Sequence, residues 1–440
     1  MTYAGYITRI TNVHKHPNAD RLAIGECFGN TVVVGLDTSD NQLGIYFPCD
    51  GQLSSEFLKA NDLIGTVDAN GVRSGGFFNE SGRVRAQKFR KVKSDGYFCP
   101  TSFLQFTGVD FGFFLDNEGK PFTEINGIVI CKKYVTEQTT RASKYKPRDP
   151  QEETVKFPLF FKHKDTEQLE YCVGEIPMGA VLSITEKVHG TSQRSSNTLK
   201  VTNVVGWRKF INNIFKAPIF KASSEYEYVC GTRNVIIKDF NSYYGFKGSV
   251  ERTVRQESHL KFFGMLEKGE TVYYEIVGYF DKDTLIMSTC DNKVVMSDKE
   301  FTKKFGNTTT FHYGCPIGEH DVYVYRMTMT NEDGVEIDYD YPTIVKRCAV
   351  MNVKVVPLIT TIVYKGMADN LINSLKGYLN GTETEPAYIT SNITPAHIME
   401  GVVVRVNSTV WKAYKLKAWA FKIIEQGVKD TGVVDVEESS

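Results

Sequence analysis

The chain of 440 residues carries no excess of either charge. Lys plus Arg and Asp plus Glu number 52 each, which excludes a protein-wide basic field. A nucleic-acid surface would therefore be a local patch of clustered positive charge. No apolar run reaches the ~18 residues of a membrane-spanning helix, and the first residues form neither a signal peptide nor a lipidation motif. We expect a soluble, intracellular protein without a membrane partner.

The nine cysteines include no C-x-x-C pair and no Cys/His spacing typical of zinc sites. We expect them to be reduced and mostly buried, as in a cytosol-like compartment. Hydrophobic residues make up 41% of the chain and charged residues 24%, which argues against extensive disorder. The length allows two or three domains, each with its own core.

The first 131 residues have the pattern of an all-β domain. Short runs rich in Val, Ile, Tyr and Phe alternate with Gly, Asn and Asp turns, and these runs occupy residues 3–10, 31–36, 43–47 and 127–131. A basic stretch at 83–93 includes four residues that we assign to RNA binding, namely Arg83, Arg85, Lys88 and Arg90. A solvated barrel face is the alternative reading of this stretch.

Two motifs flank the basic stretch, HPNADRL at 16–22 and SDGY at 94–97. With it they resemble the tRNA-binding OB module of phenylalanyl- and methionyl-tRNA synthetases, which shows H-P-x-A-D-x-L, a basic strand and S-x-G-M. Tyr97 stands where that family usually has Met. In the alternative reading, His16 and Asp20 only fix a loop through bonds to nearby backbone.

Residues 132–169 read as an interdomain linker. The part from 136 to 150 lacks periodicity and mixes Pro with charges of both signs, and an apolar anchor follows at 157–161.

Lys187 lies where a predicted strand ends. Residues 180–188 alternate apolar and polar side chains, and Gly190 marks a turn. A lysine amine attacks phosphorus only when neutral, so a nucleophilic lysine needs desolvation or neighbouring cations. A solvated lysine that protects a strand edge is the alternative.

Further polar residues follow Lys187 in an ordered series. Arg233 follows a strand, Glu275 interrupts an apolar strand at 271–278, and Tyr325 lies in a strand at 321–325. The buried-looking Glu275 needs a partner such as a metal-bound water or a ribose hydroxyl, whereas Tyr325 in a strand is by itself more typical of a core residue. Lys415 and Lys417 share one strand face by the period of two, so both can converge on one phosphate. The segment 252–266 predicts a helix.

The sequence KVHGT at 187–191 resembles motif I, K-x-[DH]-G, of the covalent nucleotidyltransferase superfamily, and within it the nick-sealing RNA ligases. EGVVVR at 400–405 and KAYKLK at 412–417 resemble motifs IV and V, so the likeness spans about residues 180–420. It implies nucleotide contacts by Glu186, His189, Arg233, Glu275, Tyr325, Lys415 and Lys417. It also implies Mg²⁺ or Mn²⁺ at Glu400 and Glu275, and catalysis by Lys187, Lys415 and Lys417.

The expected fold joins an N-terminal all-β OB barrel (1–131) to an α+β nucleotidyltransferase domain of antiparallel sheets with flanking helices (170–425). Residues 426–440 form an acidic, flexible tail. Too few residues follow Lys417 for a C-terminal OB domain. This order resembles RNA ligases whose OB module comes first.

The function that the resemblance implies is an ATP-dependent RNA ligase that seals 3′-hydroxyl/5′-phosphate nicks in duplex RNA through a lysyl-AMP intermediate, in RNA repair, as a monomer. A ligase that prefers DNA or RNA/DNA hybrids and a non-catalytic RNA-binding protein are the alternatives. A basic amphipathic segment at 207–216 either touches RNA or packs its aromatic side on the core.

Overall fold

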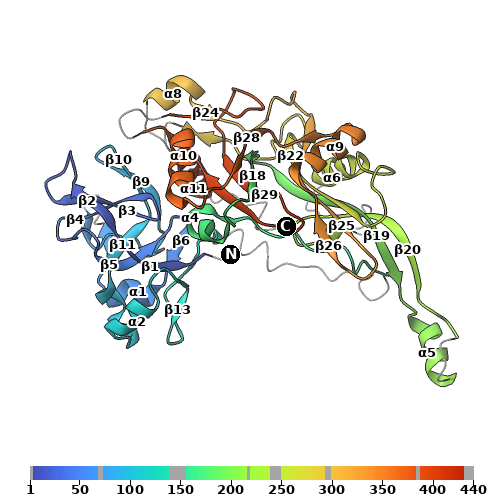
Figure 1. Ribbon diagram of the computed structural model, residues 1–440, viewed down its shortest axis with the longest axis horizontal. Helices are drawn as coiled ribbons and strands as arrows, with labels where there is room; N and C mark the ends of the chain where they lie inside the picture. The colour runs from blue at the N-terminus through green and yellow to red at the C-terminus, as the bar shows by residue number, and fades with distance from the viewer. Residues whose placement is uncertain are drawn as a thin grey trace. The chain divides into compact units, whose positions relative to one another are not determined.

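The computed structural model describes residues 3–67, 73–137, 155–215, 219–237, 249–292, 299–382 and 387–430. The chain divides into two compact units (Figure 1). Unit 1 comprises Met1–Val135, Ala368–Ala387 and Trp419–Gly427, and unit 2 comprises Thr136–Met367, Tyr388–Ala418 and Val428–Ser440. Two segments from the predicted nucleotidyltransferase region therefore group with the N-terminal residues.

Unit 1 consists mainly of short antiparallel strands. Its largest sheet has the order β11-β5-β1-β12, formed by Tyr97–Pro100, Leu43–Phe47, Gly5–Arg9 and Pro121–Phe122. A second sheet contains β2 (Thr11–Lys15), β3 (Leu22–Cys27) and β4 (Asn30–Gly35), and β9 (Ala86–Phe89) pairs with β10 (Val92–Asp95). The remaining pairs are β15 (Cys131–Lys133) with β6 (Gly51–Leu53), β7 (Gly65–Val67) with β8 (Arg73–Gly75), and β13 (Glu124–Ile125) with β14 (Ile128–Val129). Over the described residues these sheets form no closed barrel, and the OB barrel stays a prediction.

The core of unit 1 lies between these strands and short helices. The helices are α1 (Ser55–Ala60), the 3₁₀ helix η1 (Thr101–Thr107) and α2 (Phe111–Asp116). Ile45, Phe47 and Phe57 have no exposed surface, so the interior is apolar and contiguous. Ser54 caps α1 because its hydroxyl accepts the N–H of Phe57 at 3.1 Å.

Two helices from the C-terminal half of the sequence complete unit 1. They are α10 (Ala368–Asn380) and α11 (Trp419–Asp430). Nζ of Lys422 on α11 lies 2.5 Å from Oδ2 of Asp95 on β10. Burial raises the pKa of Asp95, but contacts with Lys422, a hydrogen bond with Cys49 and the charge of Lys376 together outweigh burial, so the pKa is lowered. Helix α11 continues beyond residue 425, where the acidic tail was predicted to begin, and residues 431–440 lie outside the described part.

Unit 2 contains two mainly antiparallel sheets (Figure 1). The first has the order β21-β20-β19-β22-β25-β26, formed by Ile236–Ile237, Ser223–Gly231, Thr191–Thr202, Glu270–Gly278, His320–Thr330 and Glu336–Asp338. Two further strands join it, β16 (Val155–Lys156) against β19 and β27 (Lys354–Val355) parallel to β25. The second sheet has the order β17-β30-β29-β18-β28, formed by Glu167–Gln168, Ala413–Lys417, Gly401–Val406, Val181–Lys187 and Leu358–Val363. Antiparallel sheets were predicted for this region.

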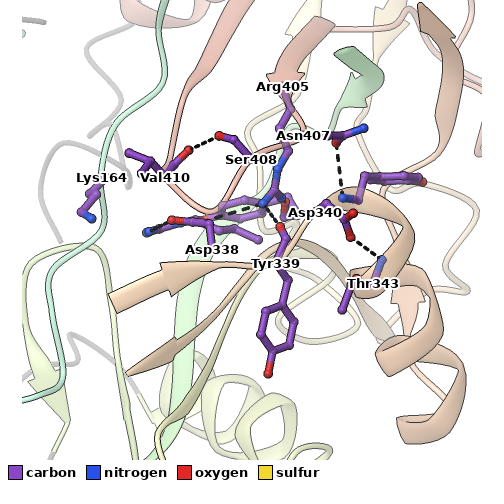
Figure 2. A network of polar contacts seen from close by, with 12 residues as sticks. Lys164, Asp338, Tyr339, Asp340, Thr343, Arg405, Asn407, Ser408 and Val410 are labelled. Atoms are coloured by element: carbon purple, nitrogen blue, oxygen red, sulfur yellow. Dashed lines mark hydrogen bonds and ion pairs between the residues drawn. The ribbon is translucent and has the colours of Figure 1, made fainter. Parts of the chain in front are cut away.

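The described part of unit 2 also contains helices. They are α4 (Leu169–Cys172), the 3₁₀ helix η2 (Val173–Glu175), α5 (Gly206–Phe215), α6 (Ser249–Leu260), α8 (Lys299–Phe305) and α9 (Tyr341–Met351), and β23 (Cys290–Asp291) pairs with β24 (Thr308–Thr309). Asp340 caps α9 by accepting the N–H of Thr343 at 2.9 Å (Figure 2). Helix α6 ends before 266, the predicted end, because turns take over from residue 261. The core between sheet and helices includes Val254, Val272 and Ile344.

Helix α5 lies beyond the paired ends of β19 and β20 (Figure 1). Phe210 and Phe215 are each 65% exposed, so they do not pack on the core, which was one of the two readings of this segment. Seven of the nine cysteines are buried. Among the described helices, none has the length and apolar character needed to cross a bilayer.

Candidate active site

Lys187 and Glu400 form an ion pair at the adjacent ends of two paired strands. Nζ of Lys187 lies 2.8 Å from Oε1 of Glu400, and Nζ of Lys417 lies 3.7 Å from the same oxygen. Nδ1 of His189 lies 3.7 Å from Oε2 of Glu400. The Glu400 side chain is 2% exposed, so these interactions are little screened by water. Motif residues that are far apart in the sequence therefore converge on one carboxylate.

The strand register explains this convergence. Gly401 on β29 lies opposite Lys187 on β18 and opposite Lys417 on β30. A Cβ on Gly401 would lie 2.2 Å from the carbonyl oxygen of Leu416, so only glycine permits β29 and β30 to approach this closely. Lys415 lies opposite Val403 and shares the strand face of Lys417, as the period of two predicted.

Gly190 has a similar packing role where β18 leads into β19. A Cβ at this position would lie 2.5 Å from the carbonyl oxygen of Ile276 on β22. Because that neighbour is backbone, any side chain would push the lysine strand away from the first sheet. The glycine of the KVHG sequence is thus explained by close packing.

Glu186 is buried beside the nucleophile candidate. Its side chain is 1% exposed, and Oε2 accepts the backbone N–H of Asn392 at 2.8 Å. Burial raises the pKa of Glu186, hydrogen bonds from Ser391 and Asn392 oppose the rise, and Glu400 adds to it. The alternation of polar residues predicted β18 correctly, but the polar positions Ser183 and Thr185 are also buried.

Tyr313 was not predicted from the sequence, yet it contacts the KVHG turn. Its hydroxyl accepts the backbone N–H of His189 at 2.7 Å. Burial raises the pKa of Tyr313, and the charges of Glu400, Glu186 and Glu275 raise it further. The tyrosine therefore stays a neutral hydroxyl among three acidic residues. Its loop position gave no periodic signal.

A second group of predicted residues lies on the first sheet. Glu275 on β22 faces Ser192 on β19 in the strand register. The hydroxyl of Tyr325 lies 2.9 Å from Oγ of Ser192 and 3.1 Å from Nδ1 of His163. Burial raises the pKa of Tyr325, and the charge of Glu275 is the next contribution. Tyr325 thus lies among polar groups.

His163 and Asp165 come from the segment that the sequence indicated as linker. Oδ1 of Asp165 lies 3.4 Å from Nη2 of Arg233 and 3.8 Å from Nε2 of His163. The apolar anchor before them is buried, because Phe157 and Phe160 pack with Val229. Residues 138–154 of the predicted linker lie outside the described part of the chain.

Glu400 is a residue that could hold a divalent cation. Its Oε2 is buried and has no hydrogen-bond partner among the described residues, and a carboxylate oxygen is a hard ligand of the kind that Mg²⁺ and Mn²⁺ prefer. A separate group of possible ligand atoms, from Glu167, Cys172 and Glu175, lies within 4.8 Å of one another. That group does not include either predicted metal ligand.

Solved structures with a similar fold include those of the RNA ligase of Naegleria gruberi. The complex with PPi has a TM-score of 0.55 and 14% identity, covering 98% of this chain and 100% of that chain. A mutant with ATP and Mn has a TM-score of 0.56 and 14% identity, covering 96% of this chain and 98% of that chain. A mutant with AMP and Mn has a TM-score of 0.55 and 14% identity, with the same coverage of both chains. This chain has the fold of an RNA ligase. No protein-family model and no curated protein matches it.

Within this RNA ligase fold, the predicted RNA-binding residues of unit 1 differ in exposure. Arg83 is 4% exposed, and its guanidinium lies 4.2 Å from the centroid of the Tyr134 ring. This burial argues against a phosphate contact by Arg83, and its assignment to RNA binding stays a prediction. Lys88 and Arg90 are exposed and Arg85 is half-buried.

His16 contacts the β9–β10 hairpin, which carries Lys88 and Arg90. A ring nitrogen of His16 lies 3.0 Å from the carbonyl oxygen of Phe89, and its Nδ1 accepts the N–H of Asn18 at 3.0 Å. The amide of Asn18 donates to the carbonyl oxygen of Arg90 at 3.0 Å. The reading in which His16 stabilises a loop thus has direct structural support.

Proposed function

We propose that the protein is an ATP-dependent RNA ligase that works through a lysyl-AMP intermediate. The observation that carries the proposal is the contact of Lys187 and Lys417 with one buried carboxylate, Glu400, within an RNA ligase fold. The first test is incubation with labelled ATP and Mn²⁺ followed by a denaturing gel. A covalent adduct supports the ligase, and its absence favours the non-catalytic RNA-binding alternative.

The proposed chemistry has three phosphoryl-transfer steps. The neutral amine of Lys187 forms a bond to the α-phosphorus of ATP, and the bond to pyrophosphate breaks. The RNA 5′-phosphate oxygen then displaces Lys187 from AMP, and finally the RNA 3′-hydroxyl attacks the 5′-phosphate and releases AMP. Lys415 and Lys417 offset the charge that develops on phosphate oxygens, since such transfers depend mainly on positioning and electrostatic stabilisation.

The ion pair in the structure also defines what must change before attack. An ammonium has no lone pair for phosphorus, so the contact of Lys187 with Glu400 must be replaced before the amine can attack. Mg²⁺ or Mn²⁺ held by Glu400, with Glu275 as the second proposed ligand, would supply positive charge that favours the neutral amine. The Naegleria ligase structures with ATP and Mn support ATP and a divalent cation as cofactors.

The nucleotide is expected to contact both sheets. We propose that Glu186 accepts from the adenine amino group, Arg233 binds the ribose, and Tyr325 stacks on the base. His189 contacts the nucleotide beside Lys187. The burial of Glu186 supports this role, since a desolvated acceptor gains more from a donor than a hydrated one.

The proposed substrate is nicked duplex RNA, in RNA repair. A ligase that prefers DNA is distinguished by substrates whose two nucleotides flanking the nick carry or lack 2′-hydroxyls, because this group is what separates RNA from DNA at a protein surface. Sealing that requires these hydroxyls supports the RNA assignment, and equal sealing of all-DNA nicks contradicts it. The protein is further proposed to act as a monomer. Light scattering of the active protein tests this.

Unit 1 is proposed to bind the RNA through Arg85, Lys88 and Arg90. Removing one phosphate contact should lower the slope of log affinity against log salt by about one unit. Arg85→Gln and Arg90→Gln should weaken nick sealing more than adduct formation. Point variants are preferable to deletion of residues 1–150, because α10 and α11 pack in unit 1 and would lose their partners. Equal losses of adduct and sealing, with unchanged RNA affinity, would rule out this role.

A further inference from the structure

Tyr325 lies at an irregularity in the pairing of β22 and β25. Tyr273 pairs with Arg326, and Tyr274 pairs with Val324, so Tyr325 has no counterpart on the neighbouring strand. One extra residue in a strand is a β-bulge, which changes the direction of a side chain and occurs often beside active sites. The bulge therefore determines where the ring of Tyr325 lies.

The side chain of Tyr325 is held at its hydroxyl end. Ser192 and His163 both lie within hydrogen-bond distance of the hydroxyl, at 2.9 and 3.1 Å. The His163 ring meets the Tyr325 ring edge-on, with centroids 5.8 Å apart. Because the His163 side chain is 6% exposed, water competes little for this contact.

The backbone of Tyr325 is held from the other sheet. Nη1 of Arg405 on β29 donates to the carbonyl oxygen of Tyr325 at 3.2 Å, and Nη2 donates to the carbonyl oxygen of Tyr339 (Figure 2). Asp338 lies 3.8 Å from Arg405 and is also bonded to Arg326, at 2.6 Å. Arg405 is 3% exposed, so its orientation is fixed by these partners.

We propose that His163 and Arg405 are positioning residues that fix Tyr325 for the base of the bound nucleotide and thereby set the affinity for ATP. This inference rests on the proposed function, in which Tyr325 contacts the base. A ring that is held at both ends loses little further freedom when the nucleotide binds, and the cost of ordering it is met during folding. In the proposed binding mode both residues act on Tyr325 and not on the reacting phosphate, so neither is expected to change the chemical step.

Loss of the hydroxyl contact should weaken nucleotide binding without slowing adenylation at saturating ATP. In His163→Ala we expect the Kd for ATP to rise roughly three- to tenfold, as for loss of one neutral hydrogen bond. The affinity for pyrophosphate, which has no base, should not change. His320→Ala is the matched control, since His320 lies on β25 itself but contacts Glu257 instead, at 3.7 Å.

A double-mutant cycle separates this role from general destabilisation. Tyr325→Phe keeps the ring and removes the hydroxyl, so His163→Ala should have no further effect on the Kd for ATP in the Tyr325→Phe background. The proposal would be contradicted if the losses of ATP-binding free energy in His163→Ala and Tyr325→Phe added fully in the double variant. Arg405→Lys should also raise the Kd for ATP, because an ammonium cannot bond both carbonyl oxygens with the geometry of the guanidinium.

Calorimetric titration of the full chain with ATP, beside the adduct assay, decides the matter. If adduct forms in the wild type and the Kd for ATP is unchanged in His163→Ala, the positioning role is wrong. If the wild type forms no adduct but binds ATP more tightly than His163→Ala, the ligase function fails and the positioning role stands. If the wild type binds no ATP, both are wrong. A fall in the adduct rate at saturating ATP, with the Kd unchanged, also overturns the positioning role.

Discussion

Glu400 is within 4 Å of two lysines, with Lys187 at 2.8 Å and Lys417 at 3.7 Å from the same carboxylate oxygen. Replacing Glu400 by Gln keeps the shape and removes the charge, so two partly buried lysines lose an ion-pair partner. We expect the adduct rate to fall on the order of 10²-fold. The rate should be measured over a range of Mn²⁺ concentrations. Glu332→Gln, at an exposed position of the same unit, is the control, and full activity of Glu400→Gln at ordinary metal concentration would refute the assigned role.

Lys415 and Lys417 should each be needed for adenylation. Changing either to Ala should lower the adduct rate on the order of 10²-fold, since each is a charge-assisted donor to phosphate. Lys417→Arg should restore little, because a planar guanidinium does not fit where a compact ammonium contacts Glu400. Lys412→Ala tests a lysine just before the same strand. If the adduct rate fell as much in Lys412→Ala as in Lys417→Ala, the total positive charge near β30 would matter, and not the specific position of Lys417.

Glu186 should make the folded state sensitive to pH. Its folded pKa is raised above the ordinary value of 4.5, chiefly by burial, so the native state binds more protons than the unfolded state between the two values. The free energy of unfolding should therefore fall as pH rises from the unfolded pKa of Glu186 to its folded pKa. Above the folded pKa this loss of stability is complete and no longer changes with pH. Glu186→Gln should remove this fall. Urea unfolding from about pH 4 to about pH 7 measures this pH dependence. If the free energy of unfolding changed with pH equally in wild type and Glu186→Gln, the prediction for Glu186 would be wrong.

Gly401→Ala tests the close approach of β29 and β30. A Cβ would lie 2.2 Å from the carbonyl oxygen of Leu416, so the strand ends that carry Glu400 and Lys417 must separate. We expect a loss of roughly 1–3 kcal/mol in the free energy of unfolding, together with loss of adduct formation. Gly377→Ala on α10 is the control, because a Cβ there meets nothing within 4 Å and should add about 0.5–1 kcal/mol. A Gly401→Ala protein with unchanged stability would contradict the packing argument.

The sequence was sufficient to predict those strands and side-chain positions that a local pattern determines. The alternation around Lys187 predicted β18, and the period of two placed Lys415 and Lys417 on one face of β30. The strand expected at 43–47 is β5. In each case the signal lies within a few consecutive residues. The direct contact of Lys187 with Glu400 was not predicted, because the motif resemblance implied only catalysis by Lys187 and metal binding by Glu400.

Features that depend on tertiary pairing were missed. The bulge at Tyr325 follows from its pairing with β22, and the contact of His163 with Tyr325 joins residues 162 positions apart. The segment around His163 has no periodicity, so it read as linker. Burial of Arg83 depends on Tyr134, and the grouping of α10 and α11 with unit 1 depends on packing that no local pattern encodes.

The central claim is that Lys187 carries the AMP. Wild-type protein incubated with labelled ATP and Mn²⁺ should yield one labelled peptide, and mass spectrometry should place the AMP on Nζ of Lys187. Lys187→Ala should form no adduct, yet it should still join nicked RNA that is supplied already adenylated, because that step does not need the attacking amine. A Lys187→Ala protein that still traps labelled AMP, or an adduct that maps to Lys415 or Lys417, would contradict the account.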